Sequence, residues 1–596
     1  MNLELELQKK IEKYDMVIEV QDILKNELGK YIKSMVDGHE VGIMCAGKHT
    51  EHLLTDFQEE IHANCILDNN HKKIGTTYMG LPIYPVDKCV ELDKVIISTY
   101  DYRDVVKKQL LQLGFAEENI IDIYDMLMQH GIYTRTEYYG IEDNVYVPFV
   151  YLNHCLKEEC NDAYMQMLIK GYLAIRDVKS AQKYLHTYIQ SNGVKCEEMK
   201  NLLRELEELI SVIKEKMSKR KQRDIIWFWQ DALCYDWVAN MPFFSHEREK
   251  GLFFQNTFNS SVWTRSVYEL IFHKRYEIDD KSYESCGKFN CEFVNALKEK
   301  GYDCVRVENL KKNEVCQMEE FDFSEKMLVS FDISTSQLYW TALNYVLNSD
   351  KPVFLLVHSV IEVHQPICSP NLLQYDVAWS NFQLRFEEEC REKLFENVKI
   401  TSLYLDGITE FVCDMLGKNA VKIFMSDHGS VLSKASRRWN KDANHFNFIV
   451  EGNQIEPRKC TGLFSLYNFE KVINYILKPN DENFADIFQK EIKLQAVDVY
   501  NRNTLEFFIK SDYAEYCVSF RGIQTLEDRY VLMKTGQEIY NVFPDDYTNY
   551  IDEPQYEERI RVLREKAGNH FIDTEDDEKF KDTYILYDFL KQKNMG

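Results

Sequence analysis

The sequence predicts a multidomain protein of the mixed α/β class, and three observations lead to that prediction. The chain has 596 residues, more than one hydrophobic core normally serves, so several domains are expected. Apolar, strand-like runs alternate with amphipathic helical segments in two separate regions, which indicates parallel βαβ units. Hydrophobic residues make up 45% of the chain and only 11 residues are Pro, so the chain can fill packed interiors and should be globular throughout.

Charge and cysteine usage restrict the possible partners and compartment. The formal net charge of -25 argues against a nucleic-acid partner, because binding a phosphate backbone needs a positive surface. The N-terminus lacks the apolar core of a signal peptide, and no long uncharged stretch could form an integral membrane segment. The 16 Cys are scattered without a CxxC pair, as in a protein with reduced, mostly buried thiols. We therefore predict a cytoplasmic protein, with its oligomeric state left open.

The N-terminal third, residues 1–140, reads as a first α/β domain. After an amphipathic opening helix, an apolar run at 41–45 predicts a strand, with a turn at Gly47 and a helix beginning near His49. Further strands are predicted to end at Asp68 and to cover 94–100 and 119–125, with a helix over 103–115 between the last two. Asp68 at its strand end can serve as a ribose-binding acid or as a cap or turn former.

This order of strand, turn, helix, strand and acid resembles the small Rossmann-like domains attached to bacterial nucleotide-sugar and polysaccharide enzymes, over residues 38–127. The loop holds only Gly47, whereas a dinucleotide-binding loop holds several glycines that let the backbone approach a pyrophosphate. The resemblance therefore implies the shape of the domain more than a nucleotide ligand.

Residues 141–222 have apolar residues at helical spacing and predict a helical spacer. Breaks are expected near 176–179 and at 192–193. The helices around 171–181 resemble a single tetratricopeptide-type hairpin, which is too little to form a solenoid. The basic run 216–223 is expected to be a solvated helix end.

Beyond residue 223, several apolar runs end in residues that can carry chemistry. One run leads into Asp231, and another, "AVKIFM", leads into Asp427 and His428. Carboxyl ends of parallel strands are where open α/β sheets place their sites. Carboxylates with imidazole suit Zn, Mn or Mg. A strand-end turn is the alternative for Asp427 and His428, but two buried charges without a partner are costly, so metal ligands are favoured.

Other candidates lie between and after these two motifs. Apolar spacing after "SSVWTRSV" starts a helix near Thr264, where a hydroxyl either caps the helix or acts as a nucleophile favoured by the helix dipole. The segment "VHSVIEVHQP" contains His364, which can either contact the substrate or be a buried core histidine. No role is assigned to its neighbours His358 and Glu362. His445 follows further on, beside another apolar run.

Taken in order, these motifs resemble the alkaline phosphatase and sulfatase superfamily over about residues 224–560. The resemblance implies an α/β/α sandwich over 223–490 and a small α+β C-terminal subdomain with a helical tail over 491–596. It implies a divalent metal held by Asp231, Thr264, Asp427 and His428. Thr264 would also be the catalytic nucleophile with His364 as the second catalytic residue, and His445 and Arg265 would bind the substrate, with a second ion as an alternative for the histidines.

Two departures from the superfamily bear on the reaction. The segment at Thr264 has no Cys and no Pro, which disfavours a formylglycine sulfatase. Val360 stands where two-metal phosphatases hold an aspartate, so one metal site is expected and the second is doubtful. A Thr nucleophile resembles the phosphoglycerol and phosphoethanolamine transferases of the superfamily, although those are usually membrane-tethered.

The resulting prediction is an enzyme that cleaves or transfers a small-molecule or glycan phosphoester, in surface-glycan or nucleotide-sugar metabolism. A sulfuric ester hydrolase without formylglycine and an inactive module that binds an anionic glycan are the alternatives.

Overall fold

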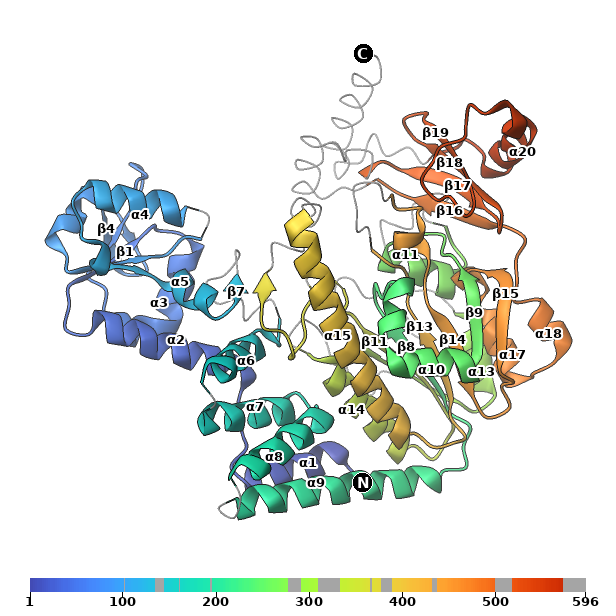
Figure 1. The fold of residues 1–596 in the computed structure, drawn as a ribbon, viewed down its shortest axis with the longest axis horizontal. Helices are drawn as coiled ribbons and strands as arrows, with labels where there is room; N and C mark the ends of the chain where they lie inside the picture. Colours follow the sequence, from blue (N-terminus) through green and yellow to red (C-terminus); the bar gives the residue numbers. More distant parts are fainter. Residues whose placement is uncertain are drawn as a thin grey trace.

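The computed structural model describes residues 1–100, 102–133, 144–159, 161–192, 196–276, 291–308, 333–364, 367–376, 388–430, 437–498 and 517–571. Figure 1 shows an N-terminal α/β domain, a group of helices, a larger α/β domain and a small C-terminal sheet. The mixed α/β class predicted from the sequence is confirmed. None of the helices in these ranges is long and apolar enough to cross a membrane.

The N-terminal domain is built on a six-stranded sheet in the order β3-β4-β2-β1-β5-β6, in which only the β3 pairing is antiparallel. Strand β1 lies centrally, and the chain winds outward from it in both directions, first through β2 and β4 and then through β5 and β6. The strands are β1 (Val41–Met44), β2 (Cys65–Leu67), β3 (Thr77–Tyr78), β4 (Leu81–Tyr84), β5 (Lys94–Ile97) and β6 (Ile120–Asp122). The helices are α2 (Val20–Val36), α3 (Lys48–Ile61), α4 (Arg103–Gln112) and α5 (Ile123–Gln129).

The opening segment forms two helices where the sequence suggests one. Helix α1 (Leu3–Lys13) ends before Asp15, whose φ of 52° is a left-handed conformation that a helix cannot continue through. Helix α1 contacts α9 and α14, and Leu3 N donates to Asn344 Oδ1 at 2.8 Å. The first helix thus packs against elements that lie hundreds of residues later in the chain.

Four helices form the middle segment: α6 (Val147–Glu158), α7 (Asp162–Ala174), α8 (Val178–Asn192) and α9 (Glu197–Ser218). The first predicted break occurs, since Arg176 has a φ of 63° between α7 and α8. The second, at 192–193, lies partly outside the described residues, between Asn192 of α8 and Cys196, the N-cap of α9. The α7 and α8 helices pack as a hairpin in which the rings of Tyr172 and Tyr184 stack at 5.3 Å. Helix α9 runs along the base of the molecule beside α1 (Figure 1).

The larger domain holds a seven-stranded sheet in the order β10-β11-β8-β13-β14-β9-β15. Strands β10, β11, β8 and β13 are parallel, and β14 is antiparallel to both of its neighbours. The strands are β8 (Ile225–Gln230), β9 (Leu252–Thr257), β10 (Asp303–Glu308), β11 (Val353–Ser359), β13 (Val421–Met425), β14 (Phe448–Gly452) and β15 (Arg458–Phe464).

Alternate residues of β8 serve two cores, one on each face of this sheet. Ile226 and Phe228 belong to the core shared with α10 (Pro242–Lys250), α14 (Thr335–Asn348) and α15 (Glu388–Met415). Trp227 and Trp229 point to the other face, where they meet α11 (Thr264–Tyr268), α13 (Glu292–Glu299) and α17 (Phe469–Leu477). Fully buried strands of this kind have apolar side chains on both faces, and helices cover both.

The C-terminal part is a four-stranded antiparallel sheet covered by one helix. Its strands are β16 (Ile492–Ala496), β17 (Phe520–Gln524), β18 (Asp528–Met533) and β19 (Glu538–Val542), and α20 (Glu557–Ala567) packs on β17 and β18. The smaller elements are β7 (Ile132–Tyr133) paired with β12 (Tyr375–Asp376), α16 (Lys441–Asn444) and α18 (Asp481–Ala485).

Candidate metal centre

Two neighbouring strands of the larger sheet bring the predicted ligands together. Strand β8 ends at Gln230, directly before Asp231, and β13 ends two residues before Asp427. The two strands are adjacent and parallel, with Trp229 opposite Met425, so their carboxyl ends meet at one edge of the sheet. Asp231 and Asp427 are fully buried there, and His428 is 8% exposed.

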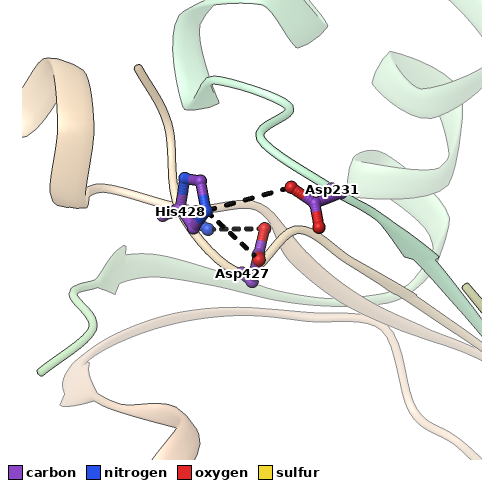
Figure 2. Close-up of side chains that lie close together, drawn as sticks. All are labelled: Asp231, Asp427 and His428. Atoms are coloured by element: carbon purple, nitrogen blue, oxygen red, sulfur yellow. Dashed lines mark hydrogen bonds and ion pairs between the residues drawn. The ribbon is translucent and has the colours of Figure 1, made fainter. Parts of the chain in front are cut away.

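The ligand atoms of Asp231, Asp427 and His428 all lie within 4.8 Å of one another (Figure 2). His428 Nε2 is 3.4 Å from Asp427 Oδ2 and 3.9 Å from Asp231 Oδ1. The sequence separates Asp231 from the other two by almost two hundred residues, and the sheet alone brings them into one cluster.

Each carboxylate in this cluster has one oxygen engaged by the protein and one without a hydrogen-bond partner among the described residues. Asp427 Oδ1 accepts the backbone N–H groups of Ala232 and His428, at 3.0 and 2.9 Å. Asp231 Oδ1 and Asp427 Oδ2 are buried with no such donor. A buried, unpartnered carboxylate oxygen is costly, and a cation removes that cost.

His428 presents the matching nitrogen. Its Nδ1 lies 2.7 Å from the carbonyl oxygen of Gly429, which can only accept, so in the neutral ring Nδ1 carries the hydrogen and Nε2 the lone pair. Two carboxylate oxygens and one imidazole nitrogen are a donor set that a divalent cation fits.

Burial is the largest influence on the pKa of each of these three groups, but its outcome differs. Burial raises the pKa of Asp427, and the charge of Asp231 adds to the effect. For Asp231, the hydrogen bond from His358 and the charges of His364 and His428 outweigh burial, so its pKa is lowered. The two carboxylates raise the pKa of His428 against the effect of burial. A positive charge beside the two buried carboxylates is therefore favoured, while a second negative charge there is disfavoured.

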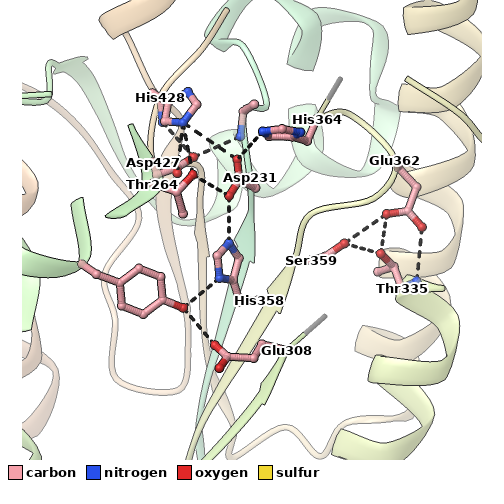
Figure 3. Close-up of polar contacts among 12 residues, drawn as sticks. Asp231, Thr264, Glu308, Thr335, His358, Ser359, Glu362, His364, Asp427 and His428 are labelled. Atoms are coloured by element: carbon pink, nitrogen blue, oxygen red, sulfur yellow. Dashed lines mark hydrogen bonds and ion pairs between the residues drawn. The ribbon is translucent and has the colours of Figure 1, made fainter. Parts of the chain in front are cut away.

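Thr264 contacts this cluster from helix α11. It is the first residue of α11, and its Oγ1 donates to Asp231 Oδ2 at 2.9 Å and lies 3.4 Å from His428 Nε2 (Figure 3). The N-cap position of α11 belongs to Trp263, so the hydroxyl of Thr264 does not serve as the cap that the sequence left open. Arg265 follows it in the first turn, half-buried, and its binding role stays a prediction.

The two remaining candidate histidines lie at different places. His364, on the loop after β11, has Nε2 4.0 Å from Asp231 Oδ1 and its side chain is 37% exposed, so it faces the cluster from the open side (Figure 3). His445 Nε2 donates to the carbonyl of Gln255 at 2.9 Å, and its ring stacks on Tyr235 at 3.6 Å. Burial lowers the pKa of His445 to about 3.

His445 lines a cavity of about 830 Å³. The cavity walls include Tyr235 and Phe258, on which His445 stacks, and the charged residues Arg391, Lys441 and Asp442. Phe258 precedes Asn259, whose Nδ2 donates to the carbonyl of Asp427 at 2.9 Å. The cavity thus begins one residue away from a contact with the metal centre.

The structure also assigns contacts to two residues that the sequence left undecided. His358, at the end of β11, places Nε2 3.1 Å from Asp231 Oδ2. Glu362 is buried away from the cluster and accepts hydrogen bonds from Tyr146, Thr335 and Ser359. A histidine in an otherwise apolar strand was the signal for His358, because a buried imidazole needs a polar partner.

Comparisons with known proteins match these two α/β parts separately. Residues 226–469 match the sulfatase family model, and residues 39–121 match the model described as C2185-like, N-terminal. No curated protein matches the chain in sequence.

Three of the solved structures similar to this chain are described below. A 2-O GAG sulfatase is 12% identical, with 57% of this chain and 90% of that chain covered and a TM-score of 0.43. The phosphonate monoester hydrolase of Agrobacterium radiobacter is 11% identical, with coverages of 58% and 94% and a TM-score of 0.41. A protein in the alkaline phosphatase superfamily from Vibrio parahaemolyticus is 13% identical, with coverages of 65% and 96% and a TM-score of 0.40.

The sulfatase match spans the strands that carry Asp231 and Asp427 and the start of the helix that carries Thr264. The match therefore identifies a domain, residues 226–469, that is similar to the sulfatase family.

Proposed function

We propose that the sulfatase-family domain cleaves or transfers a phosphate ester through Thr264. The observation that carries this proposal is the position of the Thr264 hydroxyl, 2.9 Å from Asp231 and 3.4 Å from His428, beside two unpartnered carboxylate oxygens. A nucleophile in hydrogen-bond reach of a buried acceptor is the arrangement that covalent catalysis needs.

Asp231, Asp427 and His428 would hold one divalent ion, Zn, Mn or Mg, with Thr264 at its side. When bound, the ion would neutralise charge that develops on the phosphoryl oxygens and lower the pKa of the nucleophile. Val360, where two-metal phosphatases hold an aspartate, supports a single ion.

The residues of the chain divide the proposed reaction between them. Thr264 Oγ1 attacks phosphorus, its proton passes to Asp231 Oδ2, and the bond from phosphorus to the leaving oxygen breaks. His364, on the open side of the cluster, gives a proton to that oxygen. Attack by water or by an acceptor hydroxyl on the phosphothreonine then breaks the bond from phosphorus to Thr264 Oγ1. The proton of the attacking oxygen passes to His364, and the proton held on Asp231 returns to Thr264.

The adjoining cavity supports a substrate larger than the phosphate itself. Its aromatic wall at Tyr235 and Phe258 and its charged residues suit a sugar phosphate, which offers both ring faces and polar groups. We also propose a role in surface-glycan or nucleotide-sugar metabolism, supported by the presence of the N-terminal α/β domain in the same chain. A cytoplasmic location is part of it as well, supported by the cysteines of the described ranges, which are mostly buried.

Trapping of the intermediate tests this function. The protein is mixed with Mn²⁺ or Zn²⁺ and an aryl phosphate or phosphodiester, quenched in acid, and digested for mass spectrometry. We expect a phosphorylated peptide that contains Thr264, its loss in Thr264→Ala, and its retention at a reduced rate in Thr264→Ser, which keeps the hydroxyl. Full turnover by Thr264→Ala would exclude the covalent route.

The sulfatase match makes sulfate ester hydrolysis the second candidate. The same assay with an aryl sulfate separates the two, because a sulfate-specific enzyme would turn over only that substrate. Metal binding without turnover of any ester would instead indicate a module that binds an anionic glycan.

A further inference from the structure

A line of buried polar side chains runs from Asp231 away from the metal centre. His358 Nε2 lies 3.1 Å from Asp231 Oδ2, and His358 Nδ1 lies 2.8 Å from the hydroxyl of Tyr268 (Figure 3). The same hydroxyl is 3.0 Å from Glu308 Oε2, and Arg306 Nε is 3.0 Å from Glu308 Oε1. The line therefore connects strand β8 with β11, α11 and β10.

These residues are placed where polar groups are expensive. His358 and Tyr268 are fully buried, Arg306 is 2% exposed, and Glu308 is 6% exposed. Polar and charged groups in a sheet core cost free energy unless partners compensate for their burial. Replacing them by apolar residues would suit the surrounding core of Trp229 and Phe272, so packing alone does not account for them.

We propose that His358, Tyr268 and Glu308 are positioning residues that fix the orientation of the Asp231 carboxylate. This inference rests on the proposed metal site. Asp231 Oδ2 receives both Thr264 and His358, and two hydrogen bonds to one oxygen leave the other, Oδ1, turned toward Asp427 and His428. Without that restraint the carboxylate can rotate about its last bond, because that rotation is soft.

Each further member holds the one before it. The ring of His358 lies against Trp229, with centroids 4.4 Å apart, and the hydrogen bond to Tyr268 sets which way its two nitrogens point. Tyr268 is in turn stacked on Trp229 at 4.7 Å and tied to Glu308. Glu308, the last carboxylate of the line, forms an ion pair with Arg306, so its buried charge is not left unpaired. Outer partners of metal ligands orient them in this way.

Metal binding, measured apart from turnover, tests the inference. Mn²⁺ affinity is determined by calorimetric titration of the full-length protein and of Tyr268→Phe, which removes one hydroxyl and keeps the ring. We expect the affinity to fall about tenfold or more, as for other outer partners of metal ligands. Tyr530→Phe is the matched control, because Tyr530 is also fully buried and donates to a carboxylate, Glu538, at 2.6 Å, in the C-terminal sheet. It should leave the affinity unchanged.

A second pair of variants guards against a fold defect in Tyr268→Phe. His358→Gln keeps an N–H that can reach Asp231, whereas His358→Phe keeps the flat ring on Trp229 and has no donor. A positioning role predicts that the Gln variant binds Mn²⁺ more tightly than the Phe variant. If the ring of His358 acts only through packing, the Phe variant should have the higher thermal stability, and the two variants should bind Mn²⁺ equally well.

The outcomes for the inference and for the proposed function are separate. If the unaltered protein binds neither Mn²⁺ nor Zn²⁺, the proposed metal centre is wrong. If it binds the metal and Tyr268→Phe binds it equally well, or the two His358 variants do not differ in affinity, the positioning role alone is wrong.

Discussion

At the scale of single residues, the two carboxylate oxygens of Asp427 have different surroundings: one is bound by the backbone and the other faces the candidate site. Oδ1 is fixed by the N–H groups of Ala232 and His428, and Oδ2 is left for the centre. The fixed oxygen determines where the free one points. This candidate ligand is therefore positioned by the backbone of its own loop and of the neighbouring strand end.

Asp427→Asn is predicted to abolish metal binding while sparing the fold. The amide oxygen can still accept both backbone N–H groups, but the NH₂ group then takes the place of Oδ2 and cannot bind a cation. We expect at least a hundredfold loss of Mn²⁺ affinity in a chelator competition assay, and a comparable loss of phosphoester turnover.

The thermal stability of the same variant provides a check with the opposite sign. In chelator, Asp427→Asn should unfold at a higher temperature than the unaltered protein, because it removes one of two buried carboxylates that repel each other. Adding Mn²⁺ should raise the unfolding temperature of the unaltered protein only. A variant that gains stability from Mn²⁺ as the unaltered protein does would show that Asp427 is not a ligand.

At the scale of elements, the turn after His428 is set by a neighbouring segment. Gly429 N donates to the carbonyl of Ala443, and Ser430 N donates to the carbonyl of Asp442. A Cβ added at Gly429 would lie 2.0 Å from the Asp442 carbonyl oxygen, closer than any real contact. The glycine is required because two stretches of backbone approach each other, which the sequence could not show.

Gly429→Ala is therefore predicted to move the His428 turn and to destabilise the protein. The clash is with backbone, which cannot rotate away, so a loss of about 1 to 3 kcal/mol in the free energy of unfolding is expected from urea denaturation. Mn²⁺ affinity should fall as well. Gly47→Ala is the control, since nothing lies within 4 Å of its added Cβ and its φ is -134°. Equal effects of the two substitutions would contradict this reading of the turn.

At the scale of the whole molecule, the C-terminal sheet supports the segment that holds this turn. Arg529 is fully buried and pairs with Asp546 at 2.6 Å. Asp546 Oδ2 accepts the N–H of Lys441 at 2.7 Å, and its carbonyl accepts from Asn440 at 2.5 Å. The route from the C-terminal sheet to His428 thus passes through Lys441, Asp442 and Gly429.

Asp546→Asn is predicted to be strongly destabilising for a substitution at a buried position of the C-terminal part. It leaves the buried guanidinium of Arg529 without its counter-charge, which costs about 3 to 5 kcal/mol in comparable cases. Urea denaturation followed by circular dichroism measures the loss. Arg561→Gln removes an ion pair with Glu558 whose side chains are 54% and 76% exposed, and it should leave the midpoint nearly unchanged. A similar shift for both would contradict the support role of the buried pair.

Long-range contacts of the same kind connect other parts of the chain to the domain that matches the sulfatase model. Tyr146, at the start of the helical segment, donates its hydroxyl to Glu362 on the loop that carries His364. Met1 and Leu3 donate to side chains of α14. The domain boundaries at 140, 222 and 490 remain predictions, and these contacts show that the helical segment packs closely on the domain that follows it.

The sequence by itself determined the α/β class, the break near Arg176 in the helical segment and the strand ends that carry Asp231, Asp427 and His428. Those features are local: apolar periodicity, turn formers and a polar residue directly after an apolar run. The sequence also suggested Thr264 but could not separate a helix cap from a hydroxyl facing the site. A hydroxyl at a helix start looks the same in both cases.

Only the tertiary structure decided which of these residues meet. Strand order placed β8 beside β13, and that pairing brought Asp231 to Asp427. Helix α11 brought the Thr264 hydroxyl to Asp231 and His428. It also turned His358 from an undecided neighbour into a partner of Asp231, and it placed His445 on an aromatic stack in the adjoining cavity. The physical reason is that a site of this kind consists of distances between residues far apart in the chain, and those distances are set by sheet register and packing rather than by any local pattern.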